Sequence, residues 1–471
     1  MNDAMIGDRA VVLGGSMAGL LAARVLADAY AQVVVVERDE LPDTAGQRRG
    51  VPQGHHIHSL MARGQQVFEE LFPGFAADLV AGGAPMLDQL AEARLYFGGH
   101  RFAQAASGIA VVSVSRPCIE GYVRERVRAL PGVAFDDHRD VLGLAASRDG
   151  GRVTGARVSR RVDGSGDVTL DADLVVDATG RGSRLPRWLE ALGYPRPAED
   201  RVATDITYAT GVVRLRAGAL GAQRAVIVPP GGGCTRGGAL AAIEGGRHIL
   251  TLVGMLGEVP PTDADAFVEY TRSLPIPDIH DAVRDAELLD PPVAMRFPAS
   301  IRHRYERLPR FPAGLLAVGD VLCSFNPVYG QGMSVAALEA RTLREHLASE
   351  PDPRKVLRGM AKIVDPPWDI AAGADLAFPA VPGPRPLRVR MANTYVPLVQ
   401  AAAARDPEVG AAFLRVAGML DDPTALMRPA LVRRVAAAGL RRITSRRGSP
   451  GSPRRPPSSR SAGPSRPAGS R

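Results

Sequence analysis

The chain has 471 residues, of which 45% are hydrophobic and 23% are charged, and it contains three cysteines. This length and composition are typical of a protein with a large buried core and about three domain-sized units. We expect no secretory leader and no membrane span, because the first apolar run is only as long as a strand and no apolar run reaches the roughly 20 residues that a bilayer requires. Three scattered cysteines make no disulfide framework, so we expect a reducing, cytoplasmic location.

The net charge of +8 is concentrated at the end of the chain, where residues 441–471 hold nine arginines and no acidic residue. Subtracting those nine charges leaves −1 for the rest of the protein. The segment is rich in Ser, Pro and Gly, so we expect a disordered basic tail. It has no aromatic residues to stack on bases, so we expect no specific nucleic-acid partner, and binding to nucleic acid or an anionic membrane is the alternative. The basic, amphipathic stretch 428–442 is a separate candidate for weak contact with a membrane surface.

A strand, a helix and a second strand are predicted within residues 11–36, which is the order of a dinucleotide-binding unit. Gly14 makes the tight turn and Gly19 lets the helix pack closely on the strand. Ser16 stands where the middle glycine of G-x-G-x-x-G is expected, so it must fit sideways or bond a phosphate oxygen itself. The helix N-terminus offers free N–H groups to a pyrophosphate, and Glu37 is expected to bind ribose hydroxyls. An ordinary strand–turn–helix is the alternative.

Residues 46–58 form a basic, glycine-containing loop after this unit, which we expect to reach cofactor phosphates or the flavin edge. Its three histidines suggest a metal site, but no cysteine or carboxylate joins them at ligand spacing, so we predict no metal. Arg116 precedes a helix predicted over 119–130 and is either a cofactor contact or a surface charge.

Further along, residues 151–173 predict a two-stranded β excursion that returns to a strand at 174–176. Alternating apolar and polar positions between 200 and 300 predict a mostly antiparallel sheet. A helix is expected over 333–347, and residues 367–439 are predicted to be largely helical with breaks at prolines.

Several short motifs, taken in this order, resemble those of the FAD-dependent monooxygenases of the para-hydroxybenzoate hydroxylase class (group A). They are Gly14–Gly19, Glu37–Asp39, Arg49–Gln53, Ser115–Pro117, Asp177–Leu185, Gly319–Asp320 and Asn326–Met333. The likeness is nearest to the actinobacterial branch that contains the polyether polyene epoxidases, relatives of squalene epoxidase, and it covers about residues 8–440. Serine at position 16 is normal for that branch.

The resemblance implies an α/β fold with a Rossmann-type, glutathione reductase-like FAD-binding domain. That domain is discontinuous, made of residues 8–195 and 301–350, with a β excursion near 143–173. A mostly antiparallel β-sheet, residues 196–300, is inserted as the substrate-binding domain. Residues 351–440 then form a helical C-terminal region, followed by the disordered basic tail, 441–471.

The resemblance also assigns residues to the cofactor. Asp320 matches the carboxylate that holds a ribityl hydroxyl, and Arg116 matches the arginine that crosses the cofactor. The loop from Pro327 to Met333 matches the one beside the isoalloxazine ring, where a helix N-terminus stabilises the negative charge of reduced flavin. Asp177 belongs to a motif linked to reduced-nicotinamide use, or it only caps the next turn. The expected cofactor-binding residues are Gly14, Ser16, Met17, Gly19, Glu37, Arg38, Arg49, Gly50, Arg116, Val141 (a backbone contact to adenine), Asp177, Gly180, Asp320, Pro327, Gly330, Gly332 and Met333.

The chemistry implied is reduction of FAD by NADPH or NADH, addition of O2 at flavin C4a, and transfer of the distal hydroperoxide oxygen to an electron-rich substrate. We expect an epoxidase that acts on a carbon–carbon double bond of a small, apolar molecule, a polyene or isoprenoid intermediate of specialised metabolism such as antibiotic biosynthesis. Epoxidation needs no base. No catalytic side chain is identified from the sequence, and His303 and Tyr305 stay open as bases.

Other functions are compatible with the same motifs. One is hydroxylation of an aromatic polyketide or phenolic substrate, and another is a geranylgeranyl reductase-like flavin reductase. A third is a non-catalytic flavin- or lipid-binding protein. A tryptophan halogenase is disfavoured, because Trp188 and Trp368 do not form the Trp-x-Trp-x-Ile-Pro signature.

Overall fold

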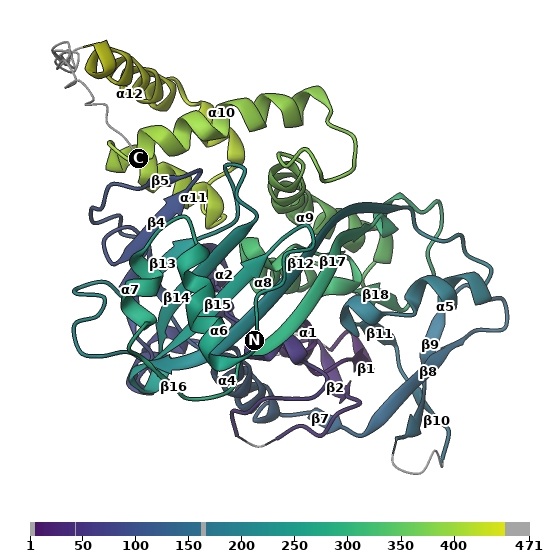
Figure 1. Cartoon of the computed structure of the whole chain (residues 1–471). Coiled ribbons are helices and arrows are strands. Elements are labelled where there is room, and N and C mark those ends of the chain that lie inside the picture. The colour runs from purple at the N-terminus through teal and green to yellow at the C-terminus, as the bar shows by residue number, and fades with distance from the viewer. Residues whose placement is uncertain (1–4, 43, 162–165, 448–471) are drawn as a thin grey trace, which may run out of the picture.

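The computed structural model describes residues 5–42, 44–161 and 166–447. Within this part of the chain, a five-stranded parallel sheet has the order β18-β11-β1-β2-β7 (Figure 1). The strands are β1 (Gly7–Leu13), β2 (Tyr30–Val36), β7 (Val133–Asp136), β11 (Leu174–Asp177) and β18 (Leu315–Ala317). Ala10, Val11, Val12 and Leu13 have no exposed surface, as expected for a parallel sheet covered on both faces. This sheet confirms the predicted Rossmann-type domain.

The helices α1 (Met17–Leu26), α4 (Arg116–Arg128) and α8 (Gly332–Glu345) share one hydrophobic core with this sheet. α8 packs against α1 although it follows more than 300 residues later, so the two helix N-termini belong to one layer. The predicted helix at 119–130 begins earlier than expected, at Arg116, because Ser115 caps it by accepting a hydrogen bond from Cys118 N.

A second, larger sheet has the order β19-β17-β12-β15-β14-β13-β4-β5, with β16 paired to β12. Its strands are β4 (Ala93–Phe97), β5 (His100–Arg101), β12 (Glu199–Arg214), β13 (Ala225–Val228), β14 (Arg236–Ile243), β15 (Arg247–Gly254), β16 (Glu287–Leu288), β17 (Val293–His303) and β19 (Cys323–Ser324). All neighbours are antiparallel except β13 and β4, which are parallel. The mostly antiparallel sheet expected near residues 200–300 is therefore present.

The expected domain boundaries need one correction. β4 and β5 lie within residues 8–195, which we assigned to the FAD-binding domain, yet they pair with the large sheet. The reason is long-range: Leu95 of β4 is buried against β13, a partner far away in the sequence. A further pair, β3 (Met86–Asp88) and β6 (Ala110–Val112), flanks this excursion.

The excursion predicted near 143–173 is a separate sheet of three strands, β8 (Arg139–Ala146), β9 (Val153–Arg160) and β10 (Val168–Asp171). It projects from the lower right of the molecule in Figure 1. The further helices that precede α8 are α2 (Ala62–Leu71), α3 (Phe75–Ala81), α5 (Leu185–Ala191), α6 (Ala264–Tyr270) and α7 (Asp278–Val283).

The C-terminal region is helical, as expected, with α9 (Pro353–Asp375), α10 (Leu387–Ala403), α11 (Pro407–Ala417) and α12 (Pro429–Arg447). Figure 1 shows α10 to α12 beside the β4 and β5 end of the large sheet. α12 continues past residue 441, the expected start of the disordered tail, because arginine is a good helix former. The rest of that expected tail, residues 448–471, lies outside the described part of the chain. Leu431 and Val435 of α12 are buried against the protein's own core, so these apolar residues are not available to a membrane.

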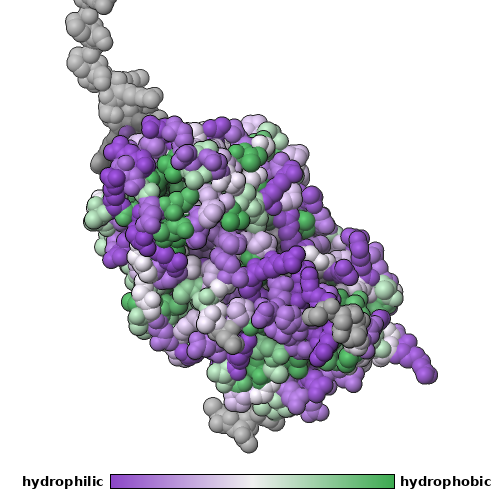
Figure 2. Space-filling model, turned by 60° about the horizontal axis from the view of Figure 1, so that its bottom comes forward, coloured by the Kyte–Doolittle hydropathy of each residue, from purple (hydrophilic) through white to green (hydrophobic). Residues whose placement is uncertain are grey.

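Hydrophilic residues cover most of the face shown in Figure 2, with apolar residues in separate groups. Among the helices of the described residues, none is both long and apolar enough to span a membrane. The three cysteines, Cys118, Cys234 and Cys323, are free thiols.

Candidate functional site

The turn between β1 and α1 has the backbone that the glycine positions predict. Gly14 has φ +107°, and a Cβ there would lie 2.5 Å from the carbonyl oxygen of Ala178. A Cβ on Gly19 would lie only 1.8 Å from the carbonyl oxygen of Gly14. These two glycines are thus required by close backbone packing. Ser16 occupies the N-cap of α1 without a capping hydrogen bond from its side chain, and the first turn holds no acidic residue, so the helix N-terminus suits an anion.

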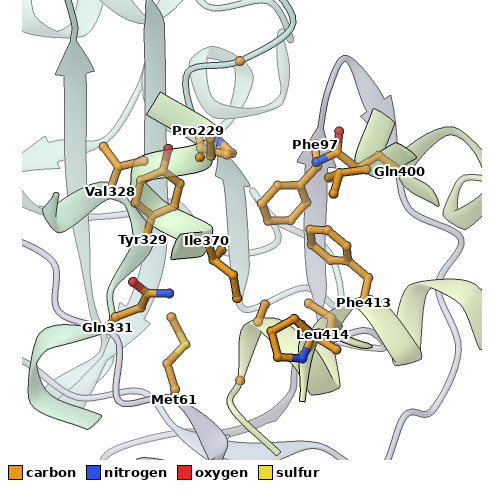
Figure 3. A pocket seen from close by; sticks show the side chains of 18 of the residues that line it. Met61, Phe97, Pro229, Val328, Tyr329, Gln331, Ile370, Gln400, Phe413 and Leu414 are labelled. Carbon is orange, nitrogen blue, oxygen red and sulfur yellow. The ribbon is translucent and has the colours of Figure 1, made fainter. Parts of the chain in front are cut away.

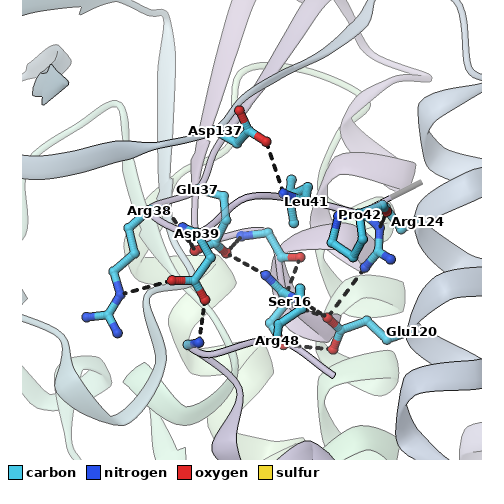
Figure 4. A network of polar contacts seen from close by, with 12 residues as sticks. Ser16, Glu37, Arg38, Asp39, Leu41, Pro42, Arg48, Glu120, Arg124 and Asp137 are labelled. Atoms are coloured by element: carbon cyan, nitrogen blue, oxygen red, sulfur yellow. Dashed lines mark hydrogen bonds and ion pairs between the residues drawn. The ribbon is translucent and has the colours of Figure 1, made fainter. Parts of the chain in front are cut away.

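Ser16 instead belongs to a buried ionic cluster, and Figure 4 shows it together with Arg48, Glu120 and Arg124. Its hydroxyl donates to Glu120 Oε2 at 3.1 Å and accepts from Arg116 Nη2 at 3.0 Å. On the other side of Glu120, Arg48 Nε donates to Oε1 at 2.9 Å, and Arg124 Nη1 lies 3.8 Å from the same oxygen. None of these four charged residues is more than 6% exposed.

This cluster carries more positive than negative charge, because three guanidinium groups face two carboxylates, those of Glu120 and Glu37. Burial acts to raise the pKa of Glu120, but Arg116 and Arg48 outweigh it and hold that pKa below its ordinary value. Arg48 Nη1 is buried and makes no hydrogen bond within the described residues, although it lies 3.4 Å from Glu37 Oε2. A pyrophosphate at the α1 N-terminus would balance this excess charge.

Sequence reasoning selected Arg49 from the basic loop, whereas the structure buries its neighbour. Arg49 is exposed and Arg48 is 6% exposed within the cluster. Nothing in the sequence separates the two arginines, because only the packed loop decides which one points inward. Gly50 is held to the end of β2 by a hydrogen bond from its N–H to Asp39 Oδ2, and a Cβ on Gly50 would collide with that oxygen.

Glu37 lies at the end of β2, as predicted. Its Oε2 accepts from Gly15 N at 2.7 Å and its Oε1 from Arg38 N at 2.8 Å. The carboxylate therefore stands beside the dinucleotide turn, while the Arg38 side chain is exposed. Val141 is half-buried on β8, and Met17 is buried at the start of α1.

Both carboxylate oxygens of Asp177 are occupied by hydrogen bonds from the turn that follows it. Its Oδ1 accepts from the N–H and the hydroxyl of Thr179, and its Oδ2 accepts from the Ser183 hydroxyl at 2.6 Å. The carboxylate is fully buried, which raises its pKa. The interpretation that Asp177 caps the following turn describes these contacts, and Gly180 takes φ +78° in that same turn.

Asp320 lies in the short 3-10 helix Gly319–Val321 and is exposed. Desolvation by the surrounding protein raises its pKa to about 6, while the charges of Arg116 and Arg181 act in the opposite direction. Gly319 N donates to Oε2 of the buried Glu339 on α8 at 2.6 Å, which fixes this turn to the helix behind it.

The loop from Pro327 to Met333 leads into the N-terminus of α8. Gly330 has φ +64°, and a Cβ there would lie 2.9 Å from Ser59 Cβ, whereas a Cβ on Gly332 would meet no atom within 4 Å. Gln331 stands at the N-cap and makes no capping bond, and its Oε1 is buried without a hydrogen-bond partner within the described residues. Pro327 is exposed and Met333 is buried. The open space at Gly332, the uncapped N-terminus of α8 and the unpaired amide oxygen of Gln331 are compatible with the polar edge of a flavin ring.

A cavity of about 1860 Å³ begins at this loop and extends between the large sheet and α9 to α11. Figure 3 shows Tyr329 and Gln331 on one side and Phe97 and Phe413 on the other, with Ile370 between them. Other apolar residues that line the cavity are Leu95, Ala225, Ile227, Ile243, Ile249 and Leu414. The cavity is therefore mostly apolar and joins the expected flavin position.

His303 and Tyr305, the two bases that the sequence left open, are not among the residues that line this cavity. Tyr305 is 1% exposed and packs edge-on against Phe311, and His303 Nε2 lies 3.6 Å from Glu199.

Two polar side chains of the cavity wall were missed by sequence reasoning. His58 places Nδ1 3.0 Å from the carbonyl oxygen of His56, so Nδ1 carries the proton and Nε2 is an acceptor. Burial, reinforced by Arg116, lowers the pKa of His58 to about 3. Tyr329 donates its hydroxyl hydrogen to Asp375 Oδ1 at 2.8 Å. The spacing of the histidines and the Pro327–Tyr329 sequence can be read from the chain, but neither indicates that Asp375, on α9, lies beside Tyr329. Within the described residues, no group of three or more metal-ligating side chains is placed to hold an ion.

Comparisons with known proteins agree with this geometry. Residues 9–362 match the FAD binding domain family. Protein Rv3254 of Mycobacterium tuberculosis is 36% identical over 452 residues, covering 92% of this chain and 94% of that protein. Kynurenine 3-monooxygenase of Salinispora tropica is 27% identical over 387 residues, covering 79% of each chain.

Solved structures share the fold at lower identity. The flavin-dependent brominase Bmp2 superposes with a TM-score of 0.64 at 15% identity, covering 94% of this chain and all of that chain. p-Nitrophenol 4-monooxygenase PnpA of Pseudomonas putida gives 0.62 at 18% identity, covering 89% of this chain and all of that chain. At these identities the likeness establishes the arrangement of sheets and helices alone.

Proposed function

We propose that this member of the FAD binding domain family, a FAD-dependent monooxygenase, epoxidises a carbon–carbon double bond of an extended, apolar substrate. The observation that carries the proposal is the apolar cavity of about 1860 Å³ that opens at the α8 N-terminus. A cavity of this size suits an extended polyene or isoprenoid better than a single phenol ring.

The residues described above fit FAD. We propose that the α1 N-terminus, Arg48 and Arg116 hold the pyrophosphate, and that Glu37 holds the ribose. Asp320 would hold the ribityl chain, and the loop before α8 would face the pyrimidine edge of the ring. When bound, FAD supplies the redox chemistry, taking electrons from NADPH or NADH and activating O2. The protein orients the substrate and excludes water from the cavity.

The experiment is turnover under labelled oxygen with product analysis by mass spectrometry. Purified holoenzyme receives NADPH or NADH and one substrate from a panel of polyenes, isoprenoids and phenolic polyketides. Gain of one labelled oxygen atom by an alkene, with loss of the double bond, supports epoxidation. Labelled phenols formed while every alkene stays unchanged would overturn it. Consumption of NADPH or NADH with no oxygenated product would favour a flavin reductase.

A second candidate, hydroxylation of a phenolic ring, is favoured by one observation. The cavity wall carries a group that can take a phenol proton, because Asp375 accepts the hydrogen of Tyr329 and burial raises the pKa of Asp375 to about 7. Phenol hydroxylation benefits from such a group because the phenolate is richer in electrons. The expected absence of a base therefore no longer supports epoxidation. The size of the cavity is the structural argument for epoxidation that remains.

We also propose a cytoplasmic location. The three free thiols suit a reducing compartment, where NADPH and NADH are available.

A further inference from the structure

Asp375 is a fully buried carboxylate directly behind the cavity wall. Its Oδ1 accepts from the Tyr329 hydroxyl at 2.8 Å and from Asn326 Nδ2 at 2.8 Å, while its Oδ2 has no hydrogen-bond partner within the described residues. Burial raises the pKa of Asp375 to about 7, against the effect of these two donors. A carboxyl group in this position, with no ion pair among the described residues, calls for a role beyond stability.

The hydrogen bonds around Asp375 fix the direction of the Tyr329 hydroxyl. Asn326 is itself held, because its Oδ1 accepts from Val328 N at 3.0 Å, so its amide nitrogen must face Asp375. The Tyr329 hydrogen is likewise directed at Asp375 Oδ1, which accepts it. Another molecule can therefore bind only to the lone pairs of the Tyr329 oxygen. Tyr329 presents an acceptor, and not a donor, to anything that binds beside it.

Tyr329 stands in the wall of the cavity, next to the apolar side chains of Val328 and Ile370 (Figure 3). It also lies two residues before the N-cap of α8, where the flavin edge is expected. An acceptor with apolar neighbours discriminates strongly, because a bound molecule that lacks a donor leaves the oxygen dehydrated and unpaired.

We propose that Tyr329 is a specificity-determining residue that accepts a hydrogen bond from a hydroxyl group of an otherwise apolar substrate, and that Asp375 is the positioning residue that orients it. The proposal rests on the proposed function only in taking the cavity as the substrate site. The substrate class is then an extended, apolar molecule with a hydroxyl group close to the carbon that is oxygenated.

The test measures binding to the oxidised holoenzyme without NADPH or NADH, so no turnover is required. The probes are 4-octylphenol and its methyl ether, which differ in the hydroxyl donor and share the apolar chain. Binding is followed by the change in flavin absorbance. The wild type is expected to bind the phenol about 10-fold more tightly than the ether, the value of one hydrogen bond to a buried acceptor.

Tyr329→Phe keeps the ring and removes the acceptor, so we expect it to bind the phenol and the ether with equal affinity. Asp375→Leu removes the group that orients Tyr329 and should lower the preference in the same way. Phe413→Leu, on the opposite wall, is the matched control and should weaken both probes by one factor. FAD content is measured for each variant.

Equal binding of the two probes by the wild type would overturn the proposal, as would an unchanged preference in a folded Tyr329→Phe protein. If Asp375→Leu does not fold, Tyr329→Phe still decides. A preference for the phenol in a protein that oxygenates no alkene or phenol would count against the proposed function and leave this assignment standing.

Discussion

Beside the dinucleotide turn, Arg48, Arg116 and Arg124 surround the carboxylate of Glu120, whereas the apolar cavity has Asp375 behind its wall. Both carboxylates are buried, but Arg116 and Arg48 lower the pKa of Glu120 and burial raises that of Asp375. The difference follows from the ligand each region suits: an anionic pyrophosphate needs excess positive charge, while an apolar substrate needs few polar atoms with fixed directions. We therefore expect substitutions near the dinucleotide turn to change stability and FAD affinity, and substitutions in the cavity to change selectivity.

The largest effect is expected from Glu120→Ala, which leaves three buried guanidinium groups without their carboxylate. Unfolding by urea should show a loss of about 3–5 kcal/mol, the usual result of breaking a buried ion pair from one side. Glu269→Ala, which breaks the exposed pair with Arg272, should cost no more than about 0.5 kcal/mol and serves as the control. A Glu120→Ala protein as stable as the wild type would mean that the cluster is not what holds α4 to the dinucleotide turn.

Asp320→Ala should release much of the FAD, because a ribityl hydroxyl would lose its charged partner at a cost of about 1.5–3 kcal/mol. This corresponds to an affinity roughly 10- to 150-fold lower, measured by flavin fluorescence on titration of the FAD-free protein. Asp285→Ala, at an exposed position, is the control. Unchanged FAD affinity in a folded Asp320→Ala protein would remove Asp320 from the site.

Glu339, which holds the Gly319–Val321 turn to α8, tests the role of a buried charge through the pH dependence of stability. Burial raises its pKa to about 8, so between about pH 4.5 and 8 the folded protein holds a proton that the unfolded chain has lost. Stability must then fall as pH rises through that window, by at most about 1.4 kcal/mol per pH unit from this group. Glu339→Gln keeps an acceptor for Gly319 N and should flatten the curve between pH 5 and 8. A slope identical to that of the wild type, in urea unfolding across this range, would contradict the assignment.

The smallest effect is expected in the cavity. Ile227→Trp narrows the space beside the large sheet, so the affinity for long apolar ligands should fall about 10-fold while short ligands and FAD bind as before. Titration with alkylphenols of increasing chain length separates these outcomes. Equal losses for short and long chains, or a loss of FAD, would show that the two regions are not independent.

Part of the site could be predicted from the sequence because local backbone geometry decides it. The dinucleotide turn needs glycine at 14 and 19 on account of contacts within the same unit, and Glu37 must follow β2 wherever that strand lies. The Asn326–Met333 motif leads into α8 by its own turn, with Gly330 at φ +64°. The parallel sheet was likewise predictable, since its strands are short, continuous apolar runs.

The remainder depends on contacts between residues far apart in the chain. The sequence alone determined a FAD-binding unit, an antiparallel sheet and a helical end, because turn glycines, apolar periods and helix caps act over a few residues. Only the tertiary structure decided that β4 joins β13, that Arg48 and not Arg49 is buried, and that Asp375 of α9 meets Tyr329. Such pairings are set by which surfaces pack together, and that information is distributed over the whole chain rather than held in any motif.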